Sequence, residues 1–104
     1  MRKVKVKICG LKRAQDIECV NKLLPDYIGF VFAKTKREVT EQQAAQLKAM
    51  LNQQIKAVGV FVNAEIDLIA RLAKSRTIDI IQLHGDEDAA YCERLRLQTE
   101  LPII

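Results

Sequence analysis

Two hydrophobic patterns alternate along the whole chain, and this alternation restricts the fold more than any other feature of the sequence. Between short apolar runs lie longer segments in which apolar side chains recur every three or four residues, as on one face of a helix. The sequence therefore predicts successive strand–helix units. The apolar runs, typical of strands, cover residues 4–9, 27–32, 57–62 and 78–83.

The first two helices have clear sequence boundaries. The first is expected over about residues 14–24, because Pro25 cannot continue it. Thr40 and Gln43 have the spacing of a capping box, which predicts that the second helix begins there. The apolar stripe expected on this second helix consists of Ala44, Leu47 and Leu51.

The last part of the chain continues the same pattern. Asn63 is expected to cap the third helix, and Asp86 to cap a fourth helix that begins with the acidic residues 86–88. Residues 101–104 are typical of the start of a fifth strand.

The strand pattern predicts an α/β fold with a parallel sheet. The second and third apolar runs are apolar on both faces, as strands covered by helices require. Such units build either a (β/α) barrel of the TIM type or a doubly wound sheet, but the G-x-G-x-x-G of dinucleotide-binding sheets is missing. A closed barrel needs eight strands, so residues 1–104 are expected to form one domain, a half-barrel with two unpaired edges.

The composition is that of a folded domain, with 49% hydrophobic and 29% charged residues. The apolar runs are much shorter than the roughly 20 residues that cross a bilayer, and Arg2 and Lys3 follow Met1 without an apolar signal-peptide core. We therefore expect a cytoplasmic protein without a membrane partner. The 3 cysteines are an odd number without metal-ligand spacing, so reduced thiols are expected rather than disulfides or a metal site.

The net charge of +4 is compatible with two classes of partner. Nucleic acid is disfavoured, because the cationic residues are spread over predicted helix surfaces with few aromatic residues near them. A small anionic substrate explains the positive excess equally well, since converging Lys and Arg side chains attract anions into a cleft.

Four motifs, one on each predicted strand, resemble those of the phosphoribosylanthranilate isomerase family. They occur in the family's order over nearly the whole chain, but they cover only the N-terminal half of the family's barrel. The resemblance implies a step of tryptophan biosynthesis, the Amadori rearrangement of N-(5'-phosphoribosyl)anthranilate by acid–base catalysis without cofactor or metal. The motifs are K-I-C-G at residues 7–10, G-F-V-F at 29–32, V-G-V-F-V-N at 58–63 and Q-L-H-G-D at 82–86.

The same resemblance implies that Cys9 is the general base that removes the C2' proton. Because side chains alternate along a strand, Lys5, Lys7 and Cys9 share one face, and a cation near the thiol favours the thiolate. The alternative is that Cys9 is an inert, buried strand residue. Cys19 and Cys92 lie within predicted helices and are expected to serve packing alone.

Three further residues are predicted to bind the substrate. Arg37 lies in a basic loop after the second strand, and the resemblance implies that it holds the anthranilate carboxylate; the alternative is a solvated loop. Gln82 and His84 share a face and are expected to point into the barrel near its catalytic rim, whereas Ile81 and Leu83 face outward. His84 could equally be a hydrogen-bonded structural group.

The family's general acid, an aspartate, and its phosphate site belong to the second half of the barrel. We therefore expect this chain alone not to be a competent isomerase. Three interpretations remain open: an isomerase piece completed by a C-terminal half, a noncatalytic half-barrel that forms a homo-oligomer, and a nucleic-acid module.

Overall fold

Strands and helices alternate strictly in the structure, a computed structural model that describes residues 6–36 and 38–104. The predicted strand residues 4–5 lie outside this part. The longest helices have 10 residues, and nothing in the described ranges combines the length and apolarity of a membrane span. In chain order the elements are β1 (Lys7–Cys9), α1 (Ala14–Leu23), β2 (Tyr27–Val31), α2 (Glu41–Met50), β3 (Lys56–Phe61), α3 (Ile66–Lys74), β4 (Ile80–Leu83) and α4 (Ala89–Arg96).

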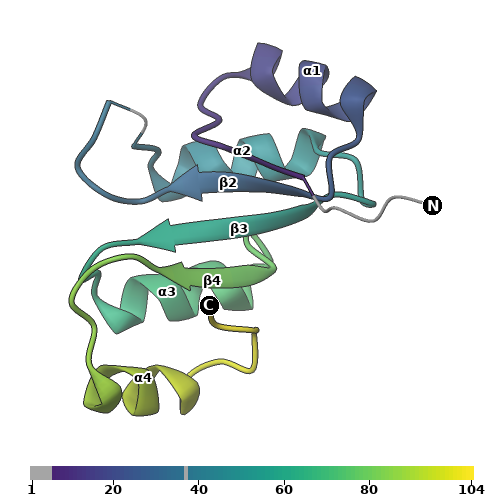
Figure 1. Cartoon of the computed structure of the whole chain (residues 1–104). Coiled ribbons are helices and arrows are strands. Elements are labelled where there is room, and N and C mark those ends of the chain that lie inside the picture. The colour runs from purple at the N-terminus through teal and green to yellow at the C-terminus, as the bar shows by residue number, and fades with distance from the viewer. Residues whose placement is uncertain (1–5, 37) are drawn as a thin grey trace.

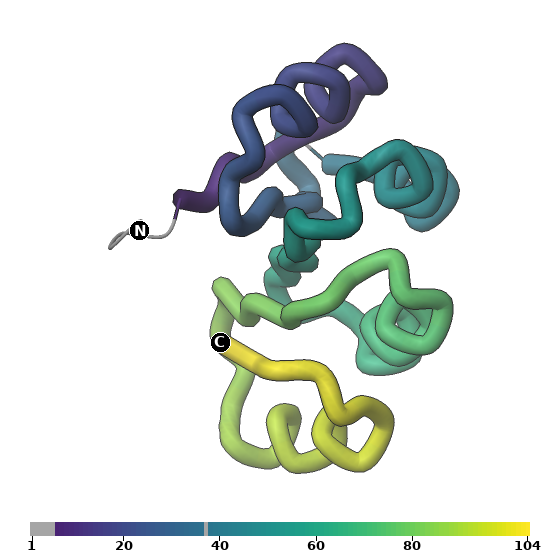
Figure 2. The backbone as a smooth tube through the Cα atoms, turned by 90° about the vertical axis from the view of Figure 1, so that its right-hand side faces the viewer, coloured from purple at the N-terminus to yellow at the C-terminus, as the bar shows by residue number. Residues whose placement is uncertain are grey.

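The four strands form one parallel sheet in the order β1-β2-β3-β4, in which α1, α2 and α3 connect neighbouring strands and α4 follows β4 (Figure 1). Seen along the sheet, the strands lie in an inner arc and the helices in an outer arc, and the inner side is open (Figure 2). Sequential parallel strands with helices on one face are the arrangement of a (β/α) barrel. The predicted half-barrel of four strand–helix units is confirmed.

The two faces of the sheet are buried in different ways. On the covered face, Ile28, Phe30 and Phe61 are fully buried and belong to one apolar cluster with the helices. On the open face, Val58 and Val60 are buried by neighbouring side chains and lie outside that cluster. This explains why the central strands are apolar on both faces. The helix residues of the cluster include Ile17, Val20, Ala44, Leu47, Ile69, Leu72 and Leu95.

The predicted extent of α1 is confirmed within one residue, and the predicted start of α2 is confirmed as well. α1 ends at Leu23, and Leu24 then adopts a left-handed backbone (φ 51°) before Pro25. The capping box of α2 is present as predicted. The N–H of Gln43 donates to Thr40 Oγ1 (3.1 Å), and the N–H of Thr40 donates to Gln43 Oε1 (2.9 Å).

The predicted caps of α3 and α4 are wrong. The capping positions are Glu65 and Asp88, each two residues later than expected, so the acidic run precedes α4. Asp88 Oδ1 accepts a hydrogen bond from the N–H of Tyr91 (2.8 Å). Asn63 and Asp86 instead bond to each other, because the N–H of Asp86 donates to Asn63 Oδ1 (3.1 Å). A contact between two loops has thus replaced two local caps.

The predicted start of a fifth strand is confirmed. Ile103 pairs in parallel with Ile81 of β4. The N–H of Ile104 donates to the carbonyl of Ile81 (2.7 Å), and the N–H of Leu83 donates to the carbonyl of Ile104 (3.1 Å). The segment therefore extends the sheet beyond β4 in the direction that continues a barrel.

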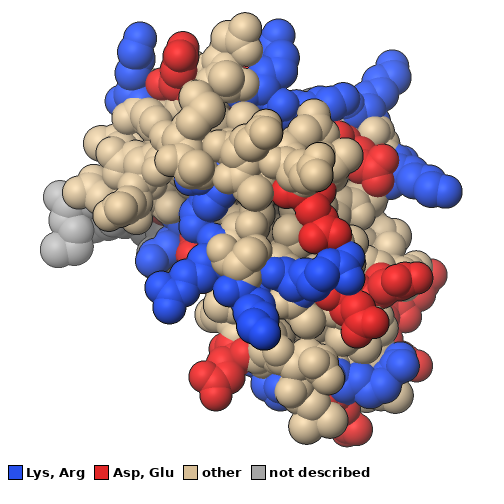
Figure 3. Space-filling view, turned by 180° about the vertical axis from the view of Figure 1, so that it is seen from behind, with Lys and Arg blue, Asp and Glu red and all other residues tan. Residues whose placement is uncertain are grey.

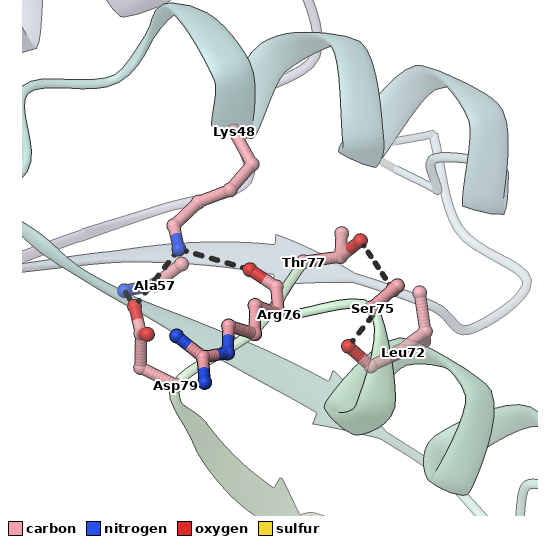
Figure 4. A network of polar contacts seen from close by, with 7 residues as sticks. All are labelled: Lys48, Ala57, Leu72, Ser75, Arg76, Thr77 and Asp79. Atoms are coloured by element: carbon pink, nitrogen blue, oxygen red, sulfur yellow. Dashed lines mark hydrogen bonds and ion pairs between the residues drawn. The ribbon is translucent and has the colours of Figure 1, made fainter.

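At the amino ends of the strands, aspartates accept hydrogen bonds from the backbone of neighbouring strands. Asp79 precedes β4, and its Oδ2 accepts the N–H of Ala57 (2.8 Å) and lies 3.3 Å from Lys48 Nζ (Figure 4). A similar hydrogen bond is present before β2, where Asp26 Oδ2 accepts the N–H of Val6 (2.7 Å). In barrels of this type, this end of the strands serves stability rather than chemistry.

We expect Asp79→Ala to lower the free energy of unfolding by about 1–3 kcal/mol, because the N–H of Ala57 loses its charged acceptor. Urea denaturation followed by circular dichroism measures the effect. Glu18→Ala on the exposed surface of α1 is the control and should change stability by less than about 0.5 kcal/mol. Equal stability of both variants would contradict the assignment.

Candidate active site

The open face of the sheet carries two of the predicted site residues, Cys9 and Gln82. Cys9 pairs in register with Gly29, Gly29 with Val58, and Val58 with Ile80. Partners in neighbouring parallel strands point to the same face, so these four form one row across the sheet. Gln82 lies one pleat farther along β4 on this face. The open face therefore combines a thiol, an amide and an apolar floor.

Cys9 is the last residue of β1, and its side chain is exposed in this structure. Gly10 then turns the chain with φ 85°, a conformation that suits glycine, while its N–H donates to the carbonyl of Gly29 (2.9 Å). The alternative of a buried, inert Cys9 does not fit this exposure. Cys19 is also exposed and Cys92 is half-buried, but both belong to helices of the outer arc.

Gly29 makes room for the thiol, a role that the sequence analysis missed. A Cβ placed on Gly29 would lie 2.6 Å from Cys9 Sγ and 3.3 Å from Cys9 Cα. No side chain fits at such a distance, so only glycine leaves the Cys9 side chain where it is. The signal in the sequence was a glycine at the start of an otherwise bulky apolar strand motif. The residue that it contacts, Cys9, lies 20 residues earlier in the chain.

Lys7 and Gln82 meet across the open face, although they lie on the first and last strands of the sheet. Lys7 Nζ donates a hydrogen bond of 2.5 Å to Gln82 Oε1. This contact requires a strongly curved sheet, as in a barrel. Lys7 precedes Cys9 by one pleat on the same face, so the ammonium group is held on the side where the thiol lies.

The structure describes only one of the other two predicted substrate contacts, His84. His84 directly follows β4, is exposed, and donates its backbone N–H to the carbonyl of Phe61 (2.8 Å). Arg37 lies outside the described residues. The loop around it is anchored, because Lys12 Nζ donates to the carbonyl of Lys36 (3.0 Å). The loops after β1 and β2 are therefore joined beyond the carboxyl ends of these strands.

Comparison with known proteins identifies the family of the chain. A family model described as N-(5'phosphoribosyl)anthranilate (PRA) isomerase matches residues 6–104. The N-(5'-phosphoribosyl)anthranilate isomerase of Lachnoclostridium phytofermentans is 50% identical over 97% of this chain and 46% of its own length. The chain thus spans about half the length of the curated relatives it matches.

Solved structures show the same relationship. A phosphoribosylanthranilate isomerase from Thermotoga maritima has a TM-score of 0.83 and 33% identity, over 96% of this chain and 51% of the other. A structure of the enzyme in complex with reduced 1-(o-carboxyphenylamino)-1-deoxyribulose 5-phosphate has a TM-score of 0.82 and 31% identity, with the same coverage. Sequence and fold therefore agree that this chain belongs to the N-(5'-phosphoribosyl)anthranilate isomerase family.

Proposed function

We propose that this chain supplies the N-terminal half of a phosphoribosylanthranilate isomerase active site, with Cys9 as the general base. The observation that carries the proposal is the position of the exposed Cys9 thiol at the carboxyl end of β1, on the open face of a half-barrel. Active sites of (β/α) barrels form at this end of the strands. The reaction belongs to tryptophan biosynthesis.

The rearrangement needs two proton transfers. An acid protonates the ribose ring oxygen as the ring opens, and a base then removes the C2' proton so that the double bond moves. Cys9 is proposed as this base, with Lys7 as the nearby cation. The family resemblance assigns the acid to an aspartate in the half of the relatives that this chain does not match. The chain tested alone is therefore proposed to be inactive.

Substrate contacts are proposed for Arg37, Gln82 and His84. The ligand in the related complex carries a carboxylate and a phosphate, so an anionic substrate suits the basic loop that contains Lys34 and Lys36. The carbonyl oxygen of Gln82 already accepts a hydrogen bond from Lys7, which leaves its amide N–H groups for the substrate.

Reconstitution tests the proposed function. The chain is mixed with the C-terminal half of the Lachnoclostridium phytofermentans relative, and turnover of N-(5'-phosphoribosyl)anthranilate is measured. We expect turnover from the mixture and none from either half alone. A stable complex of the two halves without turnover would contradict the proposal. Near-normal turnover by the chain alone would contradict the proposed need for a second half.

A self-associating half-barrel is the second candidate. It is favoured by the open face, where Val31 and Ile80 are only half-buried, and by the outer edge of β1, which pairs with no other strand among residues 6–36 and 38–104. The related Thermotoga maritima enzyme is itself described as dimeric. A native mass of twice 11.8 kDa, without turnover after reconstitution, would favour this candidate over the isomerase.

Nucleic-acid binding has less support. Lys and Arg side chains form a short band across the middle of the face in Figure 3, but Asp and Glu side chains border this band, so the basic surface is small. Nucleic-acid proteins typically gather their cations on one face or along one helix.

A further inference from the structure

The loops after β3 and β4 are joined by the carboxylate of Glu87. Its Oε2 accepts the N–H of Asn63 (2.7 Å), and its Oε1 accepts the N–H of Gly85 (2.8 Å). The side chain of Asn63 completes the link by accepting the N–H of Asp86 (3.1 Å). Each carboxylate oxygen therefore holds one loop. We call these four residues the rim clasp.

The two loops also touch closely at the clasp. A Cβ on Gly85 would lie 3.1 Å from the backbone nitrogen and Cγ of Asn63. Asn63 has a left-handed backbone (φ 49°), which asparagine adopts more readily than most residues. The hydrogen bonds thus join loops that are already in contact.

A second contact from α4 supports the same loop. The hydroxyl of Tyr91 donates to the carbonyl of Ala64, the residue after Asn63 (2.6 Å). Burial raises the pKa of Tyr91, and the nearby charge of Glu87 raises it further, so the phenol remains a neutral donor at physiological pH. The loop after β3 is therefore held by Glu87, which precedes α4, and by Tyr91 in the first turn of α4.

The clasp lies directly beside His84. The backbone of His84 is bonded to Phe61 of β3 through its N–H, and the next residue, Gly85, is bonded to Glu87. His84 is thus held between the sheet on one side and the clasp on the other. Its own side chain is exposed, and the charge of His84 contributes to the lowered pKa of Glu87.

Glu87 is ionised near neutral pH, as its hydrogen bonds to the two loops require. Partial burial raises the pKa of Glu87, but the N–H groups of Asn63, Glu87 itself and Gly85, together with His84, outweigh it, so the pKa lies below its ordinary value. His84, which follows β4, and Tyr91 of α4 are the titratable groups from neighbouring elements that interact electrostatically with the carboxylate. The carboxylate therefore remains ionised near neutral pH and keeps both loops bound.

We infer that Glu87 is a positioning residue that locks the loops after β3 and β4 together and thereby fixes His84 at the rim of the active site. The inference rests on the proposed function, in which His84 contacts the substrate. Glu87 does not itself touch the reacting atoms. Its effect on the reaction passes through the orientation of His84.

The first test uses the 104-residue chain alone and measures amide hydrogen exchange at Asn63 and Gly85. Glu87→Gln keeps the shape but removes the charge and one acceptor, so exchange at these amides should become about tenfold faster or more, the factor expected for charged hydrogen bonds. The matched control is Glu93→Gln, an exposed residue of α4, which should leave both rates unchanged. Unchanged exchange in Glu87→Gln would overturn the inference.

A pH titration of the unmodified chain covers the case in which the variant does not fold. Because the pKa of Glu87 is lower in the folded state than in the unfolded state, the clasp is complete above the unfolded value and is lost as the pH falls through the folded value. The amide NMR signals of Asn63 and Gly85 should therefore shift together with one midpoint, below the ordinary glutamate value. Independent midpoints, or none, would contradict the clasp.

The second test uses the reconstituted enzyme and separates positioning from mere stability. Glu87→Gln should raise KM by about tenfold and change kcat by less than about threefold. The reason is that it disorders the substrate contact of His84 and does not remove a proton-transfer group. Faster exchange with an unchanged KM would overturn the positioning role. If the unmodified halves form a stable complex without turnover, the proposed function fails, while the exchange experiment still decides whether the clasp exists.

Discussion

Replacement of Cys9 by alanine is expected to reduce turnover of the reconstituted isomerase by about 10²- to 10⁴-fold, the usual contribution of one proton-transfer group. The physical reason is that the C2' proton then has no base at the carboxyl end of β1. The fold should be retained, because the Cys9 side chain is exposed and lies outside the apolar cluster. Steady-state kinetics and circular dichroism measure the two effects.

Cys19→Ala is the matched control for this experiment. Cys19 is also exposed, but it lies on α1 in the outer arc and not on the open face. Its replacement should leave kcat and KM unchanged. If both variants lost activity equally, the loss would reflect general damage. If neither lost activity, Cys9 would not be the base.

Gly29→Ala is expected to reduce turnover by about 10²-fold, the effect of misplacing a reacting group by about 1 Å. The new methyl group would lie 2.6 Å from Cys9 Sγ, so either the thiol or the β1 backbone must move. The crowding should also lower the free energy of unfolding by about 1–3 kcal/mol. Turnover, urea denaturation and the rate of Cys9 alkylation by iodoacetamide measure these changes.

Gly59→Ala separates crowding of the sheet from displacement of the thiol. A Cβ on Gly59 would lie 2.9 Å from Phe61 Cε2 and 3.0 Å from Ile78 Cγ2, so it crowds the covered face instead. We expect a comparable loss of stability, about 1–3 kcal/mol, but unchanged Cys9 alkylation. Normal turnover in Gly29→Ala, or equally altered alkylation in both variants, would contradict the role of Gly29.

Local signals in the sequence were sufficient for the element order and for some boundaries. Thr40 and Gln43 bond to each other across one helical turn, so their spacing alone predicts the cap of α2. Pro25 likewise limits α1, because proline lacks the backbone N–H that would continue the helix. The same type of reasoning failed for Asn63 and Asp86, because each finds its partner in the other's loop.

The sequence by itself determined the alternation of strands and helices, the parallel sheet and the position of Cys9 at a strand's end. These follow from periodicity and chain direction, which are properties of neighbouring residues. Only the tertiary structure decided that Gly29 accommodates the Cys9 thiol, that Lys7 reaches Gln82, and that Glu87 joins two loops. These contacts bring together residues from different strand–helix units, and their distances depend on the curvature of the sheet and the path of its loops.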